Sequence, residues 1–175
     1  METIRLFRVF LSAPSDVLEE HEVLAGVLTD WNIQHGQSLG IRVELVHWRT
    51  HAHPATGRRP QSLINKQAVD GCDIVVGIFW RKFGTPTGRF GSGTEEELRR
   101  GIASNKSVLV YFARIPPPEG TGQPLRFSKI EAFKKKLGTH ALYWEYGSME
   151  GFEHDVRNHL AMVMQDLHIK HKLRK

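Results

Sequence analysis

Hydrophobic residues along this chain change repeatedly from the spacing of a strand to the spacing of a helix. Short apolar or alternating runs, each bounded by turn-forming residues, predict five strands. We expect these strands over residues 5–13, 41–48, 73–80, 107–113 and 140–146. The run 73–80 is apolar on both faces, which is typical of a central parallel strand, whereas 41–48 is more polar and is expected nearer an edge.

Helical spacing fills the intervals between these strands. In the first interval, Leu24, Leu28 and Trp31 recur at the helical period, and Ser15 is the candidate cap. We expect helices over residues 15–34, 61–69, 94–104, 127–137 and 149–168. Alternating strands and helices imply right-handed crossovers and a parallel sheet with helices on both faces. The predicted fold class is therefore α/β and flavodoxin-like, with a five-stranded parallel sheet in the order 2-1-3-4-5.

The composition is typical of a single globular domain. Of the 175 residues, 40% are hydrophobic and 25% are charged, and no repeat or linker divides the chain. The longest apolar run, 74–80, is too short to cross a bilayer, so we expect a cytoplasmic protein without a membrane partner. The lone cysteine, Cys72, abuts the central strand and is expected to be buried.

Positive charge is concentrated at the C-terminus. The formal net charge is +5, and the last eight residues, HIKHKLRK, hold four cations and no acid. We therefore predict one domain over residues 1–169, followed by a basic tail over residues 170–175. A short basic tail is typical of a solvated helix end, so we expect no nucleic-acid partner.

The stretch best suited to chemistry is the glycine-rich loop after the central strand, which opens into a helix at Thr94. Three glutamates follow at residues 95–97, in the region where ligands bind in open α/β sheets. One interpretation is a capping box, in which Thr94 accepts from the Glu97 amide and the Glu97 carboxylate returns to Thr94. The other is catalytic: the helix N-terminus keeps Glu97 ionised, so that it stabilises or attacks an oxocarbenium-like centre.

The same loop offers backbone amides to an anion. Gly91, Ser92 and Gly93 present N–H groups with little side-chain obstruction, over which a phosphate could sit. The loop is not a Walker loop, because no lysine follows the last glycine, and it does not fit GxGxxG. A classical dinucleotide-binding fold is therefore not indicated.

A second irregular segment, residues 49–60, has no hydrophobic period. It contains three arginines and no acid, and we expect a long exposed loop that a carboxylate-bearing surface could order. His51 and His53 have HxH spacing within it, but no third ligand lies nearby in the sequence. We therefore expect no metal site.

Several short motifs resemble the TIR domain. Residues 9–12, VFLS, with Asp16 four positions later, look like its opening, and Glu97-Leu98 resembles its catalytic glutamate followed by leucine. More specifically, the segment 60–98, which includes GSGTEEEL, resembles an uncharacterised bacterial TIR-like family that often sits at the N-terminus of larger signalling or defence proteins. The resemblance extends from the first strand to the last helix.

This resemblance implies a site. TIR domains share the flavodoxin-like sheet, and many bacterial and plant members cleave NAD at the nicotinamide–ribose bond with that glutamate, here Glu97. The residues then expected to line the substrate pocket are Ser12, Trp48, Trp80, Gly84, Ser92 and Thr94. TIR domains place Ser-x-Trp-Cys before the glutamate. Here Gly93-Thr94-x-x-Glu97 stands instead and resembles the nucleophile motif of nucleoside deoxyribosyltransferases.

The first hypothesis is therefore a TIR-like NAD glycohydrolase, an NAD+ nucleosidase of bacterial signalling or anti-phage defence, with NAD as substrate and no cofactor. A second is a non-catalytic TIR-like interaction module. A third is hydrolysis or transfer at the N-glycosidic bond of a nucleoside or nucleotide. The resemblance also implies self-association or a sensor partner, because the TIR loop that matches residues 49–60 contacts a neighbouring protomer and gates the site.

Overall fold

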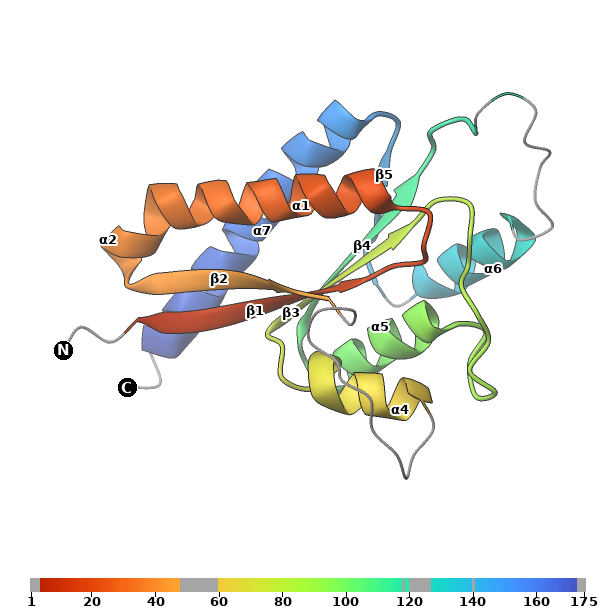
Figure 1. The fold of residues 1–175 in the computed structure, drawn as a ribbon, viewed down its shortest axis with the longest axis horizontal. Coiled ribbons are helices and arrows are strands. Elements are labelled where there is room, and N and C mark those ends of the chain that lie inside the picture. Colours follow the sequence, from red (N-terminus) through yellow and green to blue (C-terminus); the bar gives the residue numbers. More distant parts are fainter. Residues whose placement is uncertain (1–3, 48–59, 118, 120–126, 140, 173–175) are drawn as a thin grey trace.

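The computed structural model describes residues 4–47, 60–117, 119, 127–139 and 141–172. Within this part of the chain, five parallel strands form one sheet in the order β2-β1-β3-β4-β5 (Figure 1). The strands are β1 (Arg5–Ser12), β2 (Ile41–Val46), β3 (Ile74–Phe79), β4 (Ser107–Ala113) and β5 (Trp144–Tyr146). The predicted fold class is thus confirmed, with the polar strand β2 at an edge and the fully buried strand β3 in the centre.

Helices cover both faces of the sheet, as predicted. They are α1 (Leu18–Trp31), α2 (Gln37–Leu39), α4 (Pro60–Ile64), α5 (Gly93–Ala103), α6 (Phe127–Leu137) and α7 (Met149–Lys172), with π-helical turns η1 (Asn32–Gly36) and η2 (Asn65–Val69). Helices α1 and α7 lie on one face, and η2, α5 and α6 lie on the other (Figure 1). No helix among the described residues is long and apolar enough to cross a bilayer.

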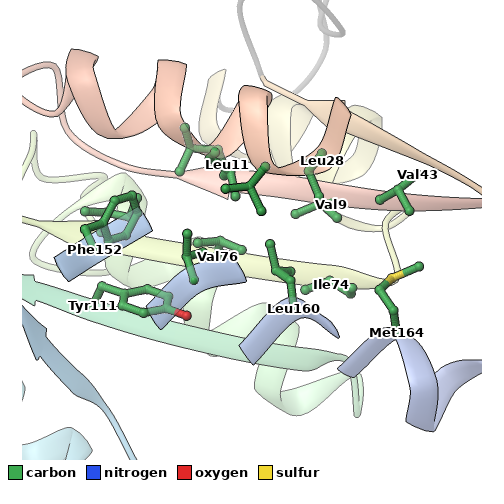
Figure 2. Packing of buried hydrophobic residues seen from close by; sticks show 14 of the residues in the cluster. Val9, Leu11, Leu28, Val43, Ile74, Val76, Tyr111, Phe152, Leu160 and Met164 are labelled. Carbon is green, nitrogen blue, oxygen red and sulfur yellow. The ribbon is translucent and has the colours of Figure 1, made fainter. Parts of the chain in front are cut away.

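Alternate residues of the strands point to opposite faces of the sheet and belong to two hydrophobic clusters. Toward α1 and α7, Val9 and Val76 meet the buried stripe of α7 that includes Phe152 and Leu160 (Figure 2). On the opposite face, Phe10, Val75 and Phe79 pack with Leu98 of α5 and Phe133 of α6. Cys72 is buried in this second cluster as predicted, and burial raises the pKa of its thiol to about 11, which favours the protonated thiol at neutral pH.

The first helical segment differs from its prediction at both ends. It begins at Leu18, without a side-chain cap, rather than at Ser15. The Asp16 carboxylate instead accepts hydrogen bonds from the amides of Arg81 and Lys82, at 2.9 and 2.8 Å, and so holds the chain where it leaves β3. The segment also continues through Gly36, which was expected in a loop, and ends only at Gly40 with a positive φ of 62°.

The side chain of Asn32 explains why the segment runs on. Its amide nitrogen donates to the Val43 carbonyl at 2.8 Å, and its amide oxygen accepts from the Val43 N–H at 2.7 Å. Asn32 therefore pairs with the backbone of the edge strand β2, as a neighbouring strand would. The π-helical turn places the side chain for this contact, which the hydrophobic pattern could not reveal.

Helix α5 lies unusually close to the sheet. Leu98 is fully buried, whereas Ile102, one turn further along the helix, is 44% exposed. A Cβ atom added at Gly77 of β3 would lie 2.6 Å from Leu98 Cδ2, and one added at Gly101 would lie 3.0 Å from Val75 Cγ2. These two glycines permit an approach that any larger residue would prevent.

We predict that Gly77→Ala lowers the free energy of unfolding by about 1 to 3 kcal/mol, because the new methyl group overlaps Leu98 and pushes α5 outward. Gly26→Ala is the matched control. Nothing lies within 4 Å of the Cβ position there, so alanine should stabilise α1 by about 0.5 to 1 kcal/mol. Urea unfolding of both variants measures the difference. Unchanged stability of Gly77→Ala would contradict the close packing.

Candidate functional site

The candidate site forms where β1 ends and α5 begins. Ser12 is the last residue of β1, and Glu97 lies in the second turn of α5. The Ser12 hydroxyl donates to Glu97 Oε2 at 2.5 Å. Ser12 is fully buried and Glu97 is only 6% exposed. The candidate catalytic residue, Glu97, is therefore in direct contact with Ser12, one of the residues expected to line its pocket, at the carboxyl edge of the sheet where ligands bind in this fold.

The second oxygen of Glu97 is held from the opposite side by Gln61, a residue of α4. The Gln61 side-chain amide donates to Glu97 Oε1 at 2.8 Å. Gln61 reaches this position by crossing Gly93, where an added Cβ would lie 2.6 Å from Gln61 Oε1. Both carboxylate oxygens thus accept a hydrogen bond, and the Glu97 side chain has a fixed orientation.

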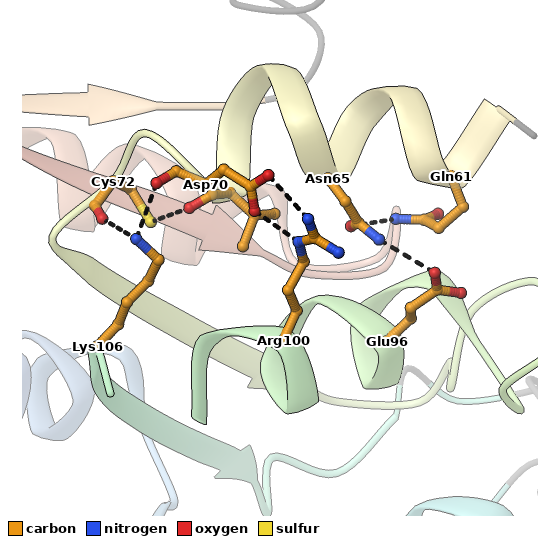
Figure 3. Close-up of polar contacts among 8 residues, drawn as sticks. Gln61, Asn65, Asp70, Cys72, Glu96, Arg100 and Lys106 are labelled. Atoms are coloured by element: carbon orange, nitrogen blue, oxygen red, sulfur yellow. Dashed lines mark hydrogen bonds and ion pairs between the residues drawn. The ribbon is translucent and has the colours of Figure 1, made fainter. Parts of the chain in front are cut away.

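A second carboxylate, that of Glu96, joins the same network. Asn65 donates to Glu96 Oε1 at 3.1 Å, and the Thr87 hydroxyl donates to Glu96 Oε2 at 2.6 Å. Gln61 also donates to Asn65 Oδ1 at 3.2 Å, and Figure 3 shows the contacts from Gln61 through Asn65 to Glu96. Together with the bond from Gln61 to Glu97, they connect the two glutamates. Two adjacent buried glutamates therefore share one hydrogen-bonded cluster, supplied by α4, η2 and the loop after β3.

Burial controls the charge of Glu97. Desolvation raises the pKa of its carboxyl from 4.5 to about 7, and the charge of Glu96 acts in the same direction. The hydrogen bonds from Ser12 and Gln61 lower this pKa but do not offset the desolvation. The sequence predicts that the helix N-terminus keeps this carboxylate ionised, whereas desolvation shifts its pKa in the opposite direction, toward the protonated form. A carboxyl that titrates near neutrality can hold or release a proton during a reaction.

The cap of α5 is not the one predicted. Ser92 is the N-cap, and its hydroxyl accepts from the Glu95 amide at 3.0 Å, while the Glu95 carboxylate accepts from the Gly91 amide at 3.1 Å. The capping box proposed for Thr94 and Glu97 is therefore displaced by two residues. Glu97 takes no part in capping, and its position needs a different explanation.

The other predicted pocket residues divide into two groups. Gly84, Ser92 and Thr94 lie together: Gly84 has a φ of 99°, and a Cβ there would lie 3.1 Å from Ser92 Cβ and 3.8 Å from Thr94 Oγ1. Thr94 is buried, and its carbonyl is 3.5 Å from Ser12 Oγ. These three residues therefore lie close together, and Thr94 brings the group next to Ser12.

Trp80 is not part of this group. The indole N–H of Trp80 donates to the Ile115 carbonyl at 2.8 Å, and its ring packs against the cluster beneath α1 and α7, on the opposite face of the sheet from α5. Trp48 lies outside the described residues, as do His51 and His53. Among the residues that are described, no group of three His, Cys, Asp or Glu could hold a metal ion.

Two of the three amides proposed for a phosphate are already occupied. The Gly93 N–H donates to the Thr85 carbonyl at 3.1 Å, and the Gly91 N–H donates to Glu95. The expectation of a phosphate over these two amides is therefore wrong, because the loop uses them to fold on itself.

Sequence reasoning missed Gln61, Asn65 and Thr87. Gln61 and Asn65 are four residues apart, which places them on the same side of a helical segment, and this spacing was the available signal. Their partners lie 36 and 31 residues further along the chain, and only the tertiary fold brings them together.

The sheet order and the buried carboxyl define a flavodoxin-like α/β protein with a candidate acid–base or nucleophilic site at the carboxyl edge of its sheet. Residues 8–161 match the family described as "Domain of unknown function (DUF4062)", and the chain belongs to this family. No curated protein sequence matches the chain.

Several solved structures share the fold at low sequence identity. Translation elongation factor SelB from Methanococcus maripaludis is 14% identical with a TM-score of 0.53, over 93% of this chain and 37% of SelB. Era from Aquifex aeolicus is 12% identical with a TM-score of 0.50, over 93% of this chain and 57% of Era. The chain thus spans well under two thirds of either protein, and the likeness concerns the fold alone.

The TIR domains of the activated Roq1 resistosome are also similar. They are 14% identical with a TM-score of 0.49, over 90% of this chain and 99% of the TIR chain. A score at this level does not separate TIR domains from other doubly wound proteins. The sheet order that the TIR resemblance implied is nevertheless the order observed.

We predict a pH-dependent difference in stability between the wild type and Glu97→Gln. The folded protein holds the Glu97 proton more tightly than the unfolded chain, so this stabilisation is complete below pH 4.5 and is lost as the pH rises through about 7. Between pH 5 and pH 8 the wild type should lose about 2 to 3 kcal/mol relative to the variant.

Urea unfolding at the two pH values measures this difference, and any constant effect of the substitution cancels. Glu95→Gln is the control, because Glu95 is partly exposed and paired with Arg99 at 2.8 Å. Parallel pH profiles for the wild type and Glu97→Gln would show that the pKa of Glu97 is not raised.

Proposed function

We propose that this chain is a TIR-like NAD glycohydrolase in which Glu97 is the catalytic carboxylate. The observation that carries the proposal is the contact of Glu97 with Ser12 in a buried site at the carboxyl edge of the sheet. Glu97 has no role in capping α5, and its pKa of about 7 suits a group that must change or stabilise charge. The substrate class comes from the resemblance of segment 60–98 to TIR-like sequences.

The reaction breaks the bond between the ribose C1′ and the nicotinamide nitrogen. The bonding pair leaves with nicotinamide and neutralises its ring, so the leaving group needs no proton. Positive charge then develops on the ribose, and ionised Glu97 stabilises it or forms a bond to C1′. Water adds to C1′ and gives up a proton, which completes hydrolysis to nicotinamide and ADP-ribose.

Substrate entry requires one hydrogen bond of Glu97 to be exchanged. Both oxygens are occupied, one by Ser12 and the other by Gln61. Ser12 is fully buried in the sheet, whereas Gln61 is only partly buried on the short helix α4. Gln61 is therefore the partner that gives way, and a ribose hydroxyl can replace its N–H on Glu97 Oε1. Ser12 stays and positions the carboxylate.

The two alternatives share parts of this site. A nucleoside or nucleotide N-glycosidase would use the same carboxylate on a different leaving group. A non-catalytic interaction module would use Glu97 only to hold α4, through Gln61, against α5. Self-association or a sensor partner belongs to the proposal as well, because TIR-like enzymes assemble. The predicted loop 49–60 would take part in it; residues 49–59 lie outside the described residues, and Pro60 is the first residue of α4 rather than part of the loop.

Glu97→Gln should lower NAD hydrolysis by about 100-fold or more, because the amide keeps the size of the side chain but cannot balance the charge on the ribose. Glu95→Gln is the matched control: it lies on another face of the same helical turn, and glutamine serves equally well in its capping role. Mass spectrometry of NAD, nicotinamide and ADP-ribose, with concentrated protein, measures the rates.

The same assay separates the alternatives. Cleavage of a nucleoside or nucleotide but not of NAD, abolished by Glu97→Gln, would favour the N-glycosidase. Equal NAD cleavage by the wild type and Glu97→Gln would remove Glu97 from the mechanism. No cleavage of any of these substrates over a hundredfold range of protein concentration would favour the interaction module.

Ser12→Ala should shift the pH dependence of kcat/KM upward. The hydrogen bond from Ser12 lowers the pKa of Glu97, so its loss lets burial raise this pKa further above 7. Activity that needs ionised Glu97 should then rise at a higher pH than in the wild type. The exposed serine variant Ser38→Ala is the control. A Ser12→Ala profile that coincides with the wild type would show that Ser12 does not position the carboxylate.

A further inference from the structure

A hollow of about 570 Å³ lies on the far side of α5 from Glu97. Glu95 lines it, and Glu97, two residues on, is rotated by about 200° around the helix. Residues of the loop between β3 and α5 line one side of it, and Lys136 near the end of α6 lines another. The lining residues that matter here are Gly88, Arg89, Phe90, Glu95, Arg99 and Lys136.

Three cationic side chains but only one carboxylate, that of Glu95, line the hollow. Arg99 pairs with Glu95 at 2.8 Å, and the other Glu95 oxygen accepts from the Gly91 amide. The acid is therefore fully engaged within the protein. In the part of the chain that the structure describes, the Arg89 guanidinium lies over the Phe90 ring, and neither Arg89 nor Lys136 has an ion-pair partner. Two unmatched cations, from segments 47 positions apart, thus face one hollow.

The two arginines share a contact with one aromatic ring. Both guanidinium groups lie over the Phe90 ring, Arg89 at 5.7 Å and Arg99 at 5.9 Å from its centroid. The loop beneath is closed by two hydrogen bonds of 3.2 Å between Thr87 and Phe90. Cations that are already ordered lose less conformational entropy on binding than free surface side chains.

We propose that this hollow binds a phosphate-bearing ligand with at least two negative charges, such as a pyrophosphate group. Guanidinium groups form paired hydrogen bonds with phosphate oxygens, and a lysine ammonium adds a point charge. The glycine-rich loop then contacts phosphate through Arg89 rather than through the amides of Gly91 and Gly93, which are already satisfied. This site is separate from Glu97 and does not depend on the proposed reaction.

Titration calorimetry of the full chain with inorganic pyrophosphate at low salt tests the proposal. We expect saturable binding that weakens as salt is added, and at least a tenfold loss of affinity in the double variant Arg89→Glu, Lys136→Glu. The control is Arg42→Glu with Lys170→Glu, two exposed cations outside the hollow that give the same change in net charge. This control should bind as the wild type does.

Further probes identify the chemistry that is recognised. Inorganic phosphate should bind more weakly than pyrophosphate, and ADP should bind at least as well. Equal weakening in both double variants would overturn the proposal, because it would assign the attraction to net charge. Absence of pyrophosphate binding to the wild type, or binding of ADP alone, would overturn it too. Since pyrophosphate has no glycosidic bond, the result is independent of whether the chain cleaves NAD.

Discussion

The close approach of α5 to the central strand determines the geometry of the whole carboxyl edge. Leu98 packs directly onto Gly77, and Gly77 is the register partner of Ser12 on the neighbouring strand. Glu97, one residue before Leu98, is thereby brought down onto the Ser12 hydroxyl. A carboxyl placed this deep loses most of its water, and for that reason its pKa is high despite its position near a helix N-terminus. A packing contact of the core therefore sets the charge state of the candidate catalytic residue.

Three consecutive glutamates have three different environments. Successive residues of a helix point about 100° apart, so the run divides among the surroundings of α5. Glu95 closes the cap and pairs with Arg99, Glu96 binds Asn65 and Thr87, and Glu97 meets Ser12 and Gln61. An acidic run that looks uniform in the sequence thus combines a structural role, a bridging role and a candidate chemical role.

The fold was largely predictable because hydrophobic periodicity reports directly on burial. The strand order, the edge position of β2 and the bounds of α6 at 127–137 all agree with the pattern. The N-cap was not predictable in the same way. Both Ser92 and Thr94 are followed by glutamate at the capping spacing, and the sequence alone offers no way to choose between them.

The candidate site was only partly predictable. Glu97 was predictable because its helix begins at the carboxyl end of a central strand, and Ser12 was implied by the TIR resemblance, whereas Gln61 and Thr87 depend on how α4 and the loop pack. The sequence places Trp80 in the pocket, but its side chain packs on the opposite face of the sheet. Side chains of β3 point alternately to the two faces, and Trp80, which directly follows the last residue of β3, continues this alternation. The raised pKa of Glu97 could not be predicted from the sequence, because it comes from burial, which depends on the tertiary structure.

The contact between Asn32 and β2 bears on how copies of this chain can associate. An exposed edge strand normally offers its free N–H and C=O groups to a strand of another molecule. Here both groups of Val43, in the middle of β2, are taken by one side chain of the same chain. Joining two sheets through this edge would first have to break both bonds, so the edge is protected against intermolecular β-pairing. Assemblies of this protein should therefore form through helix faces and loops rather than by extension of the sheet at β2.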